Sequence, residues 1–407
     1  MESHLPAHSL NQARAQARIG LYLHVPFCAR RCSYCDFSSG GISAAAVERY
    51  LTAFEREAAL RAPQANGVEF QSVFVGGGTP SALSARHFAR LWRAVRDQFA
   101  IAPEAEITLE ANPESASDRL LEAWRAAGVN RLSMGAQSFD PAELEGLGRI
   151  HAAGRPAEAI ALARAHGFRR LSLDLMFGFP GHSSETWRRT LESALALEPE
   201  HLSAYCFIPE PGTPLGDAAR TGLKPPLAPE HQADLYEVLV ERLAAAGYTL
   251  YETSNFSRPG GECRHNLVYW LRRDYLGLGP SAHGLWRGVR EANHYALERW
   301  ADALERGEPW IEREPETAAS RADEIVMLAL RLSEGLEAAD YAPEVWAQVD
   351  ARYGAALERA ADEGRLERTT LGWRIAPRHR FVADDVIAWL AVRAAPLDDL
   401  TVAGARS

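Results

Sequence analysis

The sequence predicts an α/β protein: a partial (β/α)6 barrel followed by a smaller, mainly helical, winged-helix-like C-terminal domain. Six short apolar or β-branched runs alternate with Ala-, Leu- and Arg-rich stretches of helical spacing, which is typical of βαβ units and parallel pairing. The most distinctive glycine, cysteine and polar residues come directly after these runs. The carboxyl ends of barrel strands are where chemistry gathers, so the motifs are expected to meet at one rim.

The elements are expected in a regular order. The strands are predicted at Gly20–Val25, Ser72–Val75, Glu106–Glu110, Arg131–Gly135, Leu171–Leu175 and His201–Tyr205. The helices between them are predicted at Ala44–Ala62, Ser84–Phe99, Ser117–Ala127, Pro156–His166 and Ser183–Leu197. The later pattern is helical from Thr317, with a short strand-like piece near Trp373–Ile375.

Composition shifts divide the chain into four parts. Arg306–Pro315 has two prolines and several charges and is interpreted as a linker. The expected parts are a flexible tail (1–18), the barrel core (19–250), a connecting segment (251–315) and the C-terminal domain (316–400).

The chain has 407 residues, of which 47% are hydrophobic and 24% charged, so it can form a sizeable core. Its formal net charge of -10 argues against a nucleic-acid partner, which requires a basic surface. No apolar run is long enough to span a bilayer, and Met1–Gly20 lacks the apolar region of a secretory signal. The expected location is the cytoplasm, with a transient membrane association left open.

Three of the five cysteines lie within eight residues, in His24-Val-Pro-Phe-Cys28-Ala-Arg-Arg-Cys32-Ser-Tyr34-Cys35-Asp-Phe37. In a cytoplasmic chain such crowding indicates metal binding or catalysis rather than disulfides. Three thiolates on one loop can hold three corners of a [4Fe–4S] cluster. Two alternatives remain: a zinc ion completed by a distant histidine, and three buried thiols acting as small hydrophobes.

The C-x3-C-x2-C spacing, with Tyr34 before the last cysteine, resembles the radical S-adenosylmethionine superfamily. The resemblance implies a [4Fe–4S] cluster on Cys28, Cys32 and Cys35, with one iron left to chelate S-adenosylmethionine. It implies that one electron from the cluster cleaves this cofactor to methionine and a 5′-deoxyadenosyl radical.

Further motifs follow the later strands, and each is individually weak. Gly76-Gly77-Gly78-Thr79 permits close backbone approach, Glu110 could accept from a ribose or an amine, and Arg149 could meet a carboxylate. In order and context they resemble the anaerobic coproporphyrinogen oxidase subgroup of the superfamily. That resemblance implies an S-adenosylmethionine site formed by Tyr22, Tyr34, Gly77, Gly78, Thr79, Glu110, Gln137, Arg149 and Asp174.

Within this subgroup two functions compete. The oxidase motif continues with a further cysteine two residues after the third, where this chain has Phe37. The chain instead has His265-Asn266-Leu-Val-Tyr269-Trp270, which resembles the hallmark of the HemW family of heme chaperones. A neutral imidazole can ligate heme iron, and flat aromatic rings can pack on a porphyrin.

The HemW resemblance implies that the chain binds heme through this segment and delivers it to a hemoprotein, often a membrane respiratory enzyme. Candidate heme residues are His265, Tyr269, Trp270 and Cys263, with Cys263 and His283 as rival ligands to His265. Cys206 is interpreted as a buried thiol or a wall of the cofactor pocket. The alternatives are an oxygen-independent coproporphyrinogen III dehydrogenase and a cluster protein that never cleaves S-adenosylmethionine.

Overall fold

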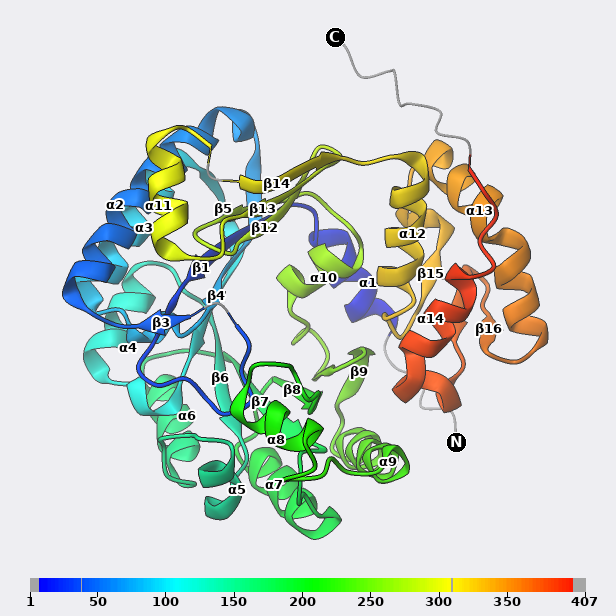
Figure 1. The fold of residues 1–407 in the computed structure, drawn as a ribbon, viewed down its shortest axis with the longest axis horizontal. Coiled ribbons are helices and arrows are strands. Elements are labelled where there is room, and N and C mark those ends of the chain that lie inside the picture. Colours follow the sequence, from blue (N-terminus) through cyan, green and yellow to red (C-terminus); the bar gives the residue numbers. More distant parts are fainter. Residues whose placement is uncertain (1–6, 38, 309, 398–407) are drawn as a thin grey trace.

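The computed structural model describes residues 7–37, 39–308 and 310–397. Its main feature is a twelve-stranded sheet in the order β14-β13-β12-β11-β1-β4-β5-β6-β7-β8-β10-β9. The sheet curves into a partial barrel that stays open, with β14 at one end and β9 at the other, and the C-terminal domain lies beside it (Figure 1).

The middle of this sheet contains the six strands expected from the sequence. They are β1 (Gly20–Val25), β4 (Glu69–Gly77), β5 (Ala100–Ala111), β6 (Arg131–Gln137), β7 (Arg170–Phe177) and β8 (His201–Cys206). Each pairs in parallel with the next strand along the chain. The prediction of a partial (β/α)6 barrel is therefore confirmed.

Helices connect these strands and cover the outside of the sheet (Figure 1). They are α2 (Ala44–Arg61), α3 (Ala85–Gln98), α4 (Asp118–Ala126), α5 (Pro141–Gly146), α6 (Arg155–Ala165), α7 (Ser184–Ala196), α8 (Pro214–Arg220) and α9 (Pro229–Ala245). Serine caps fix several helix starts: the side chains of Ser43, Ser84 and Ser183 each accept a hydrogen bond from a backbone N–H three residues on. All five helices expected from the sequence are present.

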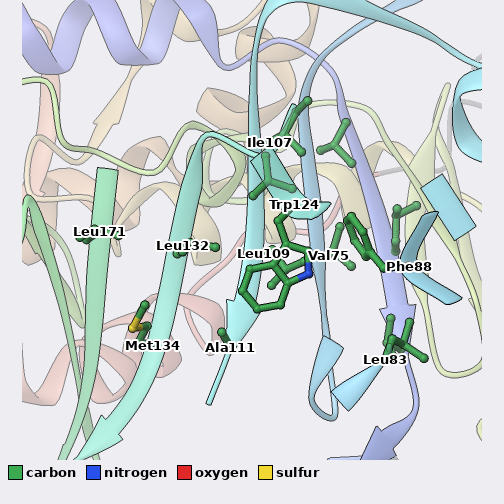
Figure 2. Close-up of a cluster of buried hydrophobic side chains, with 14 of the residues drawn as sticks. Val75, Leu83, Phe88, Ile107, Leu109, Ala111, Trp124, Leu132, Met134 and Leu171 are labelled. Atoms are coloured by element: carbon green, nitrogen blue, oxygen red, sulfur yellow. The ribbon is translucent and has the colours of Figure 1, made fainter. Parts of the chain in front are cut away.

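The strands have one apolar face and one polar face because side chains alternate along a strand. On the outer face, Leu109 and Leu132 pack with Trp124 of α4, all of them 0% exposed. Figure 2 shows this layer, in which the indole of Trp124 lies against the strands. Burying a side chain of this size contributes about 1.5–3 kcal/mol. The inner face is polar and includes Ser133, Asp174 and other residues of the site described below.

At one end the sheet continues from β1 into β11 (Tyr275–Leu278), which is parallel, and then into β12 (His283–Trp286), β13 (Val289–Asn293) and β14 (Trp310–Pro315), which are antiparallel. At the other end β8 pairs with β10 (Asn255–Ser257), which pairs with β9 (Thr249–Glu252). In the sequence, helix α10 (Arg264–Trp270) stands between β10 and β11, and α11 (Leu297–Glu305) stands between β13 and β14.

The prediction that Arg306–Pro315 is a linker is wrong for its second half. Residues 310–315 form β14, which pairs with β13. Pro315 pairs with Val289, and Trp310 pairs with Asn293. The charged side chains of β14 remain at the surface of an edge strand, and its proline stands at the strand's last position. Edge strands tolerate both features, which is why the composition looked like a linker.

The C-terminal domain has a core of its own, built from α12 (Ala318–Ala329), α13 (Pro343–Asp362) and α14 (Ala383–Ala391). A three-stranded sheet in the order β15 (Leu336–Glu337), β17 (Gly372–Ile375), β16 (Leu366–Arg368) completes it. Residues 398–400 of the expected domain lie outside the described residues.

The small remaining elements are β2 (Phe27–Cys28), β3 (Gly40–Gly41) and 3-10 turns at Ala62–Ala65, Pro80–Ala82, Pro113–Ser115, Ala338–Asp340 and Pro377–Val382. Within the described ranges, no helix is both long and apolar enough to cross a membrane.

The amino-terminal segment differs from the expected flexible tail. Residues 7–16 form α1 (Ala7–Gln16), which contacts α10, while residues 1–6 lie outside the described part of the chain. Leu10 and Ala13 fall on one face of α1, and together with Ala17, directly after the helix, they pack in a cluster with residues of α10. Arg14 pairs with Glu334 at 2.7 Å and also with Glu337 and Asp340. The tail prediction was wrong here because the segment is held by distant residues, such as Glu334 and Asp340, which stand 320 and 326 positions from Arg14.

Candidate functional site

The cysteine motif forms the loop between β1 and α2, at the carboxyl end of the barrel. Its three thiols, Cys28, Cys32 and Cys35, are free and half-buried. They line one cavity of about 390 Å³, together with Gly78 of the glycine loop after β4. The structure therefore brings the cysteine and glycine motifs to the same place.

A chain of hydrogen bonds joins two of these thiols through three later segments. Thr79 Oγ1 donates to Cys28 Sγ at 3.4 Å, and Asn112 Nδ2 donates to Thr79 Oγ1 at 3.4 Å. Arg149 then donates to Asn112 Oδ1 at 2.7 Å and to Cys32 Sγ at 3.3 Å. Asn112 was missed by the sequence reasoning, although it stands directly after β5 and two residues after Glu110.

The glycine loop lies too close to its neighbours for side chains. A Cβ on Gly78 would lie 2.7 Å from the carbonyl oxygen of Phe27 and 3.1 Å from Cys28 Sγ. Gly77 has a φ of 113°, and a Cβ there would lie 2.8 Å from the ring of His24. Glycine is required here both for close approach and for backbone conformation.

Two inward carboxyl groups, Glu110 on β5 and Asp174 on β7, stand on strands that are separated by β6 alone. Burial, with the nearby Asp174, raises the pKa of Glu110 to about 8, although Gly77 N–H donates to it at 3.2 Å. Burial also raises the pKa of Asp174, which accepts from Ser133 Oγ at 2.9 Å. Glu110 is thus largely a neutral carboxylic acid near pH 7 and can donate as well as accept a hydrogen bond.

Two further predicted residues border the cysteines. Gln137 ends β6 in a left-handed backbone conformation with a φ of 64°, where the pairing with β7 is irregular. Such strain in a residue other than glycine is often found at ligand sites. Tyr34 packs in a small apolar cluster beneath the loop, and burial raises its pKa. Burial also raises the pKa of the Cys35 thiol to about 11, so iron binding there would displace a proton.

The donor set fits an iron–sulfur cluster. Across the described residues, no three His, Cys, Asp or Glu side chains converge on one point as the ligands of a single metal ion do. A cluster presents separate iron corners to separate thiolates, so three thiols around one cavity satisfy it. Arg149 and Thr79 already point donors at two of the sulfur atoms, as thiolate ligands require.

Most of the predicted cofactor residues line this same cavity. Besides the three cysteines, these are Tyr34, Gly77, Gly78, Thr79, Glu110, Gln137, Arg149 and Asp174. Cys206 also lines it, and burial raises the pKa of that thiol to about 12. Tyr22 does not line it: its side chain faces the neighbouring cavity, with its hydroxyl 3.0 Å from His24 Nδ1.

A second cavity of about 560 Å³ occupies the interior of the barrel. Its lining includes Phe37, Gly77, Glu110, Ser133, Asp174 and Tyr205, which also line the cysteine cavity, so the two adjoin. The volume is typical of pockets for small organic ligands. Cys263, Tyr269 and His283 of the predicted heme residues line this second cavity.

Helix α10 holds the His-Asn-x-x-Tyr-Trp motif against the barrel. Glu106, buried inside β5, accepts from the backbone N–H groups of Arg264 at 2.8 Å and His265 at 3.3 Å. A carboxylate at the amino end of a helix satisfies donors that have no partner within the helix. Cys263 Sγ also donates to Glu106, at 3.5 Å, and burial raises the pKa of this thiol to about 12.

His265 has partners on both sides of its ring. Its Nδ1 lies 2.9 Å from Ser72 Oγ and its Nε2 lies 2.8 Å from Tyr269 Oη, while the ring stacks on Phe74. The side chain is fully buried, which lowers its pKa to about 3 and keeps the imidazole neutral. His265 and Trp270 line neither cavity, whereas Tyr269 faces the larger one. The structure thus places Tyr269 between the motif histidine and the cavity.

Sequence reasoning missed several residues of the larger cavity. Arg131 and His201 line its deep end, where His201 lies 2.7 Å from Ser172 Oγ and 2.8 Å from Tyr251 Oη. Both stand at the first position of their strands. A signal was available, because charged or imidazole side chains rarely occupy an inward position of a buried strand without a function or a partner.

Comparison with known proteins assigns family models to two parts of the chain. Residues 22–194 match the family model of the Radical SAM superfamily, and residues 317–382 match the HemN C-terminal domain. Among solved structures, coproporphyrinogen III oxidase (HemN) from Escherichia coli superposes with a TM-score of 0.79 at 24% identity, covering 95% of this chain and 93% of that one. At 24% identity, this similarity shows that the two proteins share a fold.

Curated relatives are more similar. The heme chaperone HemW of Mycobacterium tuberculosis (strain H37Rv) is 40% identical over 387 residues, covering 91% of this chain and 94% of the relative. HemW of Bacillus subtilis is 32% identical over 367 residues, covering 90% and 97%. By these matches, the chain belongs to the radical SAM superfamily and, within it, to the HemW family.

Proposed function

We propose that this protein is a heme chaperone that binds a [4Fe–4S] cluster, S-adenosylmethionine and heme, and delivers the heme to a hemoprotein. The observation behind this proposal is the pair of adjoining cavities. One is lined by the cysteine and glycine motifs, and the other by Tyr269 of the HemW motif together with Cys263 and His283. The relatives named as heme chaperones support the same function.

The cysteine cavity is proposed to hold the cluster and the cofactor. Cys28, Cys32 and Cys35 would ligate three irons, and the bound cluster would supply the electron that cleaves S-adenosylmethionine. Arg149 keeps Cys32 in place through its hydrogen bond. Neutral Glu110 would meet ribose or amine groups at the floor of this cavity without adding a charge there.

The larger cavity is proposed to hold the heme, with His283 as the iron ligand. His283 is exposed and lines this cavity, so an iron can reach its ring without rearrangement. The two ring nitrogens of His265 are already engaged, and the Cys263 thiol is held protonated beside Glu106. His265 would then act as a positioning residue that keeps Tyr269 turned toward the heme.

The proposed setting is the cytoplasm, with a membrane respiratory enzyme as the recipient of the heme. Transfer can be followed by mixing heme-loaded protein with the apo form of such an enzyme and recording the recipient's Soret spectrum. Appearance of that spectrum at a rate faster than from free hemin supports delivery. A rate equal to that of free hemin contradicts it.

The primary test is a hemin titration of the cluster-loaded protein, read at the Soret band. Wild type is expected to bind about one heme per chain. His283→Ala is expected to shift the Soret maximum and weaken binding at least about tenfold, because an axial ligand is lost. His265→Ala is expected to keep the band position with a smaller loss of affinity. His87→Ala on the outer helix α3 is the matched control and should titrate as wild type.

The outcomes of these experiments distinguish the proposed function from its alternatives and assign the roles of the two histidines. Absence of saturable binding to wild type would overturn the chaperone proposal. A Soret change in His265→Ala but not in His283→Ala would reverse the two histidine roles. Anaerobic conversion of coproporphyrinogen III by the same preparation would favour the dehydrogenase alternative.

The cluster is tested separately, by iron and sulfide content after anaerobic reconstitution. Cys32→Ala is expected to lose most of both, because a cluster needs each of its three thiolates. Cys206→Ala changes a thiol in the same cavity and is expected to retain them. Retention of the cluster in Cys32→Ala would show that the triplet is not the ligand set.

A further inference from the structure

The floor of the larger cavity has two buried donors without a partner in the described protein. They are Arg131 Nη2 and Thr108 Oγ1. Both side chains line the cavity, and the two residues are only 2% and 1% exposed. They are also register partners across β5 and β6, so they lie side by side. A buried donor without an acceptor costs about 1–3 kcal/mol, and more when it is charged.

The other edge of the Arg131 guanidinium is fixed by the protein. Its Nη1 donates to the carbonyl oxygens of Gly261 at 2.9 Å and Glu262 at 3.4 Å. Glu106 lies 3.6 Å away but is shared with Arg170 and with the amino end of α10. One edge of the fork therefore anchors the side chain, and the other is left to the cavity.

The position of Arg131 sets the direction of a ligand. Arg131 is the first residue of β6 and Gln137 is the last, so they lie about 20 Å apart at the rise of an extended strand. Gln137 borders the cysteine cavity, whereas Arg131 lies at the far end of the larger one. A group bound by Arg131 therefore points away from the cysteines.

We propose that Arg131 and Thr108 form a carboxylate subsite at the floor of the barrel, which takes one acidic side chain of the tetrapyrrole. This rests on the proposed function, since it assigns an orientation to the same ligand. The planar guanidinium fork suits a carboxylate, and the resulting hydrogen bonds are charge-assisted. The threonine hydroxyl supplies a further donor beside it. The iron-bearing ring then lies between this floor and His283.

The test compares hemin with hemin dimethyl ester, in which both carboxylates are blocked. Wild type is expected to bind hemin about 10- to 100-fold more tightly than the ester, the worth of a buried charged hydrogen bond. Arg131→Met is expected to bind both alike, at about the affinity of wild type for the ester. Thr108→Val keeps the shape of the side chain and is expected to lose a smaller part of the preference.

Arg170→Met is the matched control, because Arg170 contacts the same Glu106 but does not line the cavity. It is expected to keep the full preference for hemin. The subsite is overturned if Arg131→Met keeps the preference, or if Thr108→Val keeps it in full when Arg131→Met does not fold. Wild type that binds neither compound refutes the heme function itself, which is a different result.

Discussion

Arg149 donates a hydrogen bond to the sulfur of Cys32 at 3.3 Å, across 117 positions of sequence. The same guanidinium donates to Asn112 Oδ1 and to the carbonyl oxygen of Gly135, both at 2.7 Å. One side chain therefore ties the cysteine loop to the ends of β5 and β6. The thiol positions depend on this link as well as on their own loop.

Removing that link is expected to loosen the cluster site. Arg149→Met leaves two partly buried oxygens without their donor, at a cost of up to about 1–3 kcal/mol each, and frees Cys32. The cluster absorbance should decay faster in a chelator, and S-adenosylmethionine binding measured by calorimetry should weaken about 10-fold or more. Arg189→Met removes an arginine that is 56% exposed and should change neither. Equal decay rates in both variants would contradict the role given to Arg149.

The glycine loop offers a second test. Gly78→Ala places a methyl group 2.7 Å from a backbone carbonyl oxygen that has no flexible end to move aside. The strain is expected to cost on the order of 1–3 kcal/mol and to displace Cys28. Iron content after reconstitution should fall. Gly41→Ala, at a position with no atom within 4 Å, is the control and should reconstitute fully.

Glu57 predicts a pH dependence of stability. Burial raises its pKa to about 7, even though Gly279 N–H and Asn293 Nδ2 each donate to it at 2.6 Å. An unfolded glutamate has a pKa of about 4.3, so between these values the folded chain holds a proton that the unfolded chain has lost. The contribution of Glu57 to stability is therefore full below pH 4.3 and declines as the pH rises to 7.

The check is denaturant unfolding of Glu57→Gln and wild type at pH 4.5 and pH 8. The fall in unfolding free energy between the two pH values should be smaller in Glu57→Gln by about 3 kcal/mol. Glu55→Gln is the control of opposite sign. The hydrogen bond from Arg90 lowers the pKa of Glu55, so its contribution is lost at low pH instead. A pH dependence in Glu57→Gln identical to wild type would count against the shift.

The ion pairs of Arg14 predict that this side chain attaches helix α1 to the C-terminal domain. Its guanidinium is 5% exposed and lies among Glu334, Glu337 and Asp340. Arg14→Met leaves Glu334 and Glu337 without this cation and Asp340 with the more distant Arg273, and losing one partner of a buried ion pair costs about 3–5 kcal/mol. Limited proteolysis should then release residues 1–17 much faster than in wild type. Arg18→Met alters an exposed arginine whose side chain donates to the nearby Ala15 carbonyl, and it should not speed this release.

The alternating pattern of the sequence was enough to predict the six barrel strands and five of the helices around them. Each strand has buried apolar residues on its outer face, so its periodicity is a local property that needs no partner to be visible. The cysteine spacing likewise predicts the ligands, because three thiols on one loop are close together in any fold. Glu110, Gln137, Arg149 and Asp174 were predicted because their order and context resemble the anaerobic coproporphyrinogen oxidase subgroup.

Tertiary structure decided what depends on contacts between distant segments. The helix at 7–16 and the strand at 310–315 form against partners that lie elsewhere in the chain, so composition alone suggested a tail and a linker. The role of Arg131 likewise depends on tertiary structure. Its guanidinium contacts Glu106 and Gly261 and lines a cavity that is assembled from many strands. Local periodicity encodes which residues face the core, but the pairing of a buried charge is settled only when the strands and loops assemble around it.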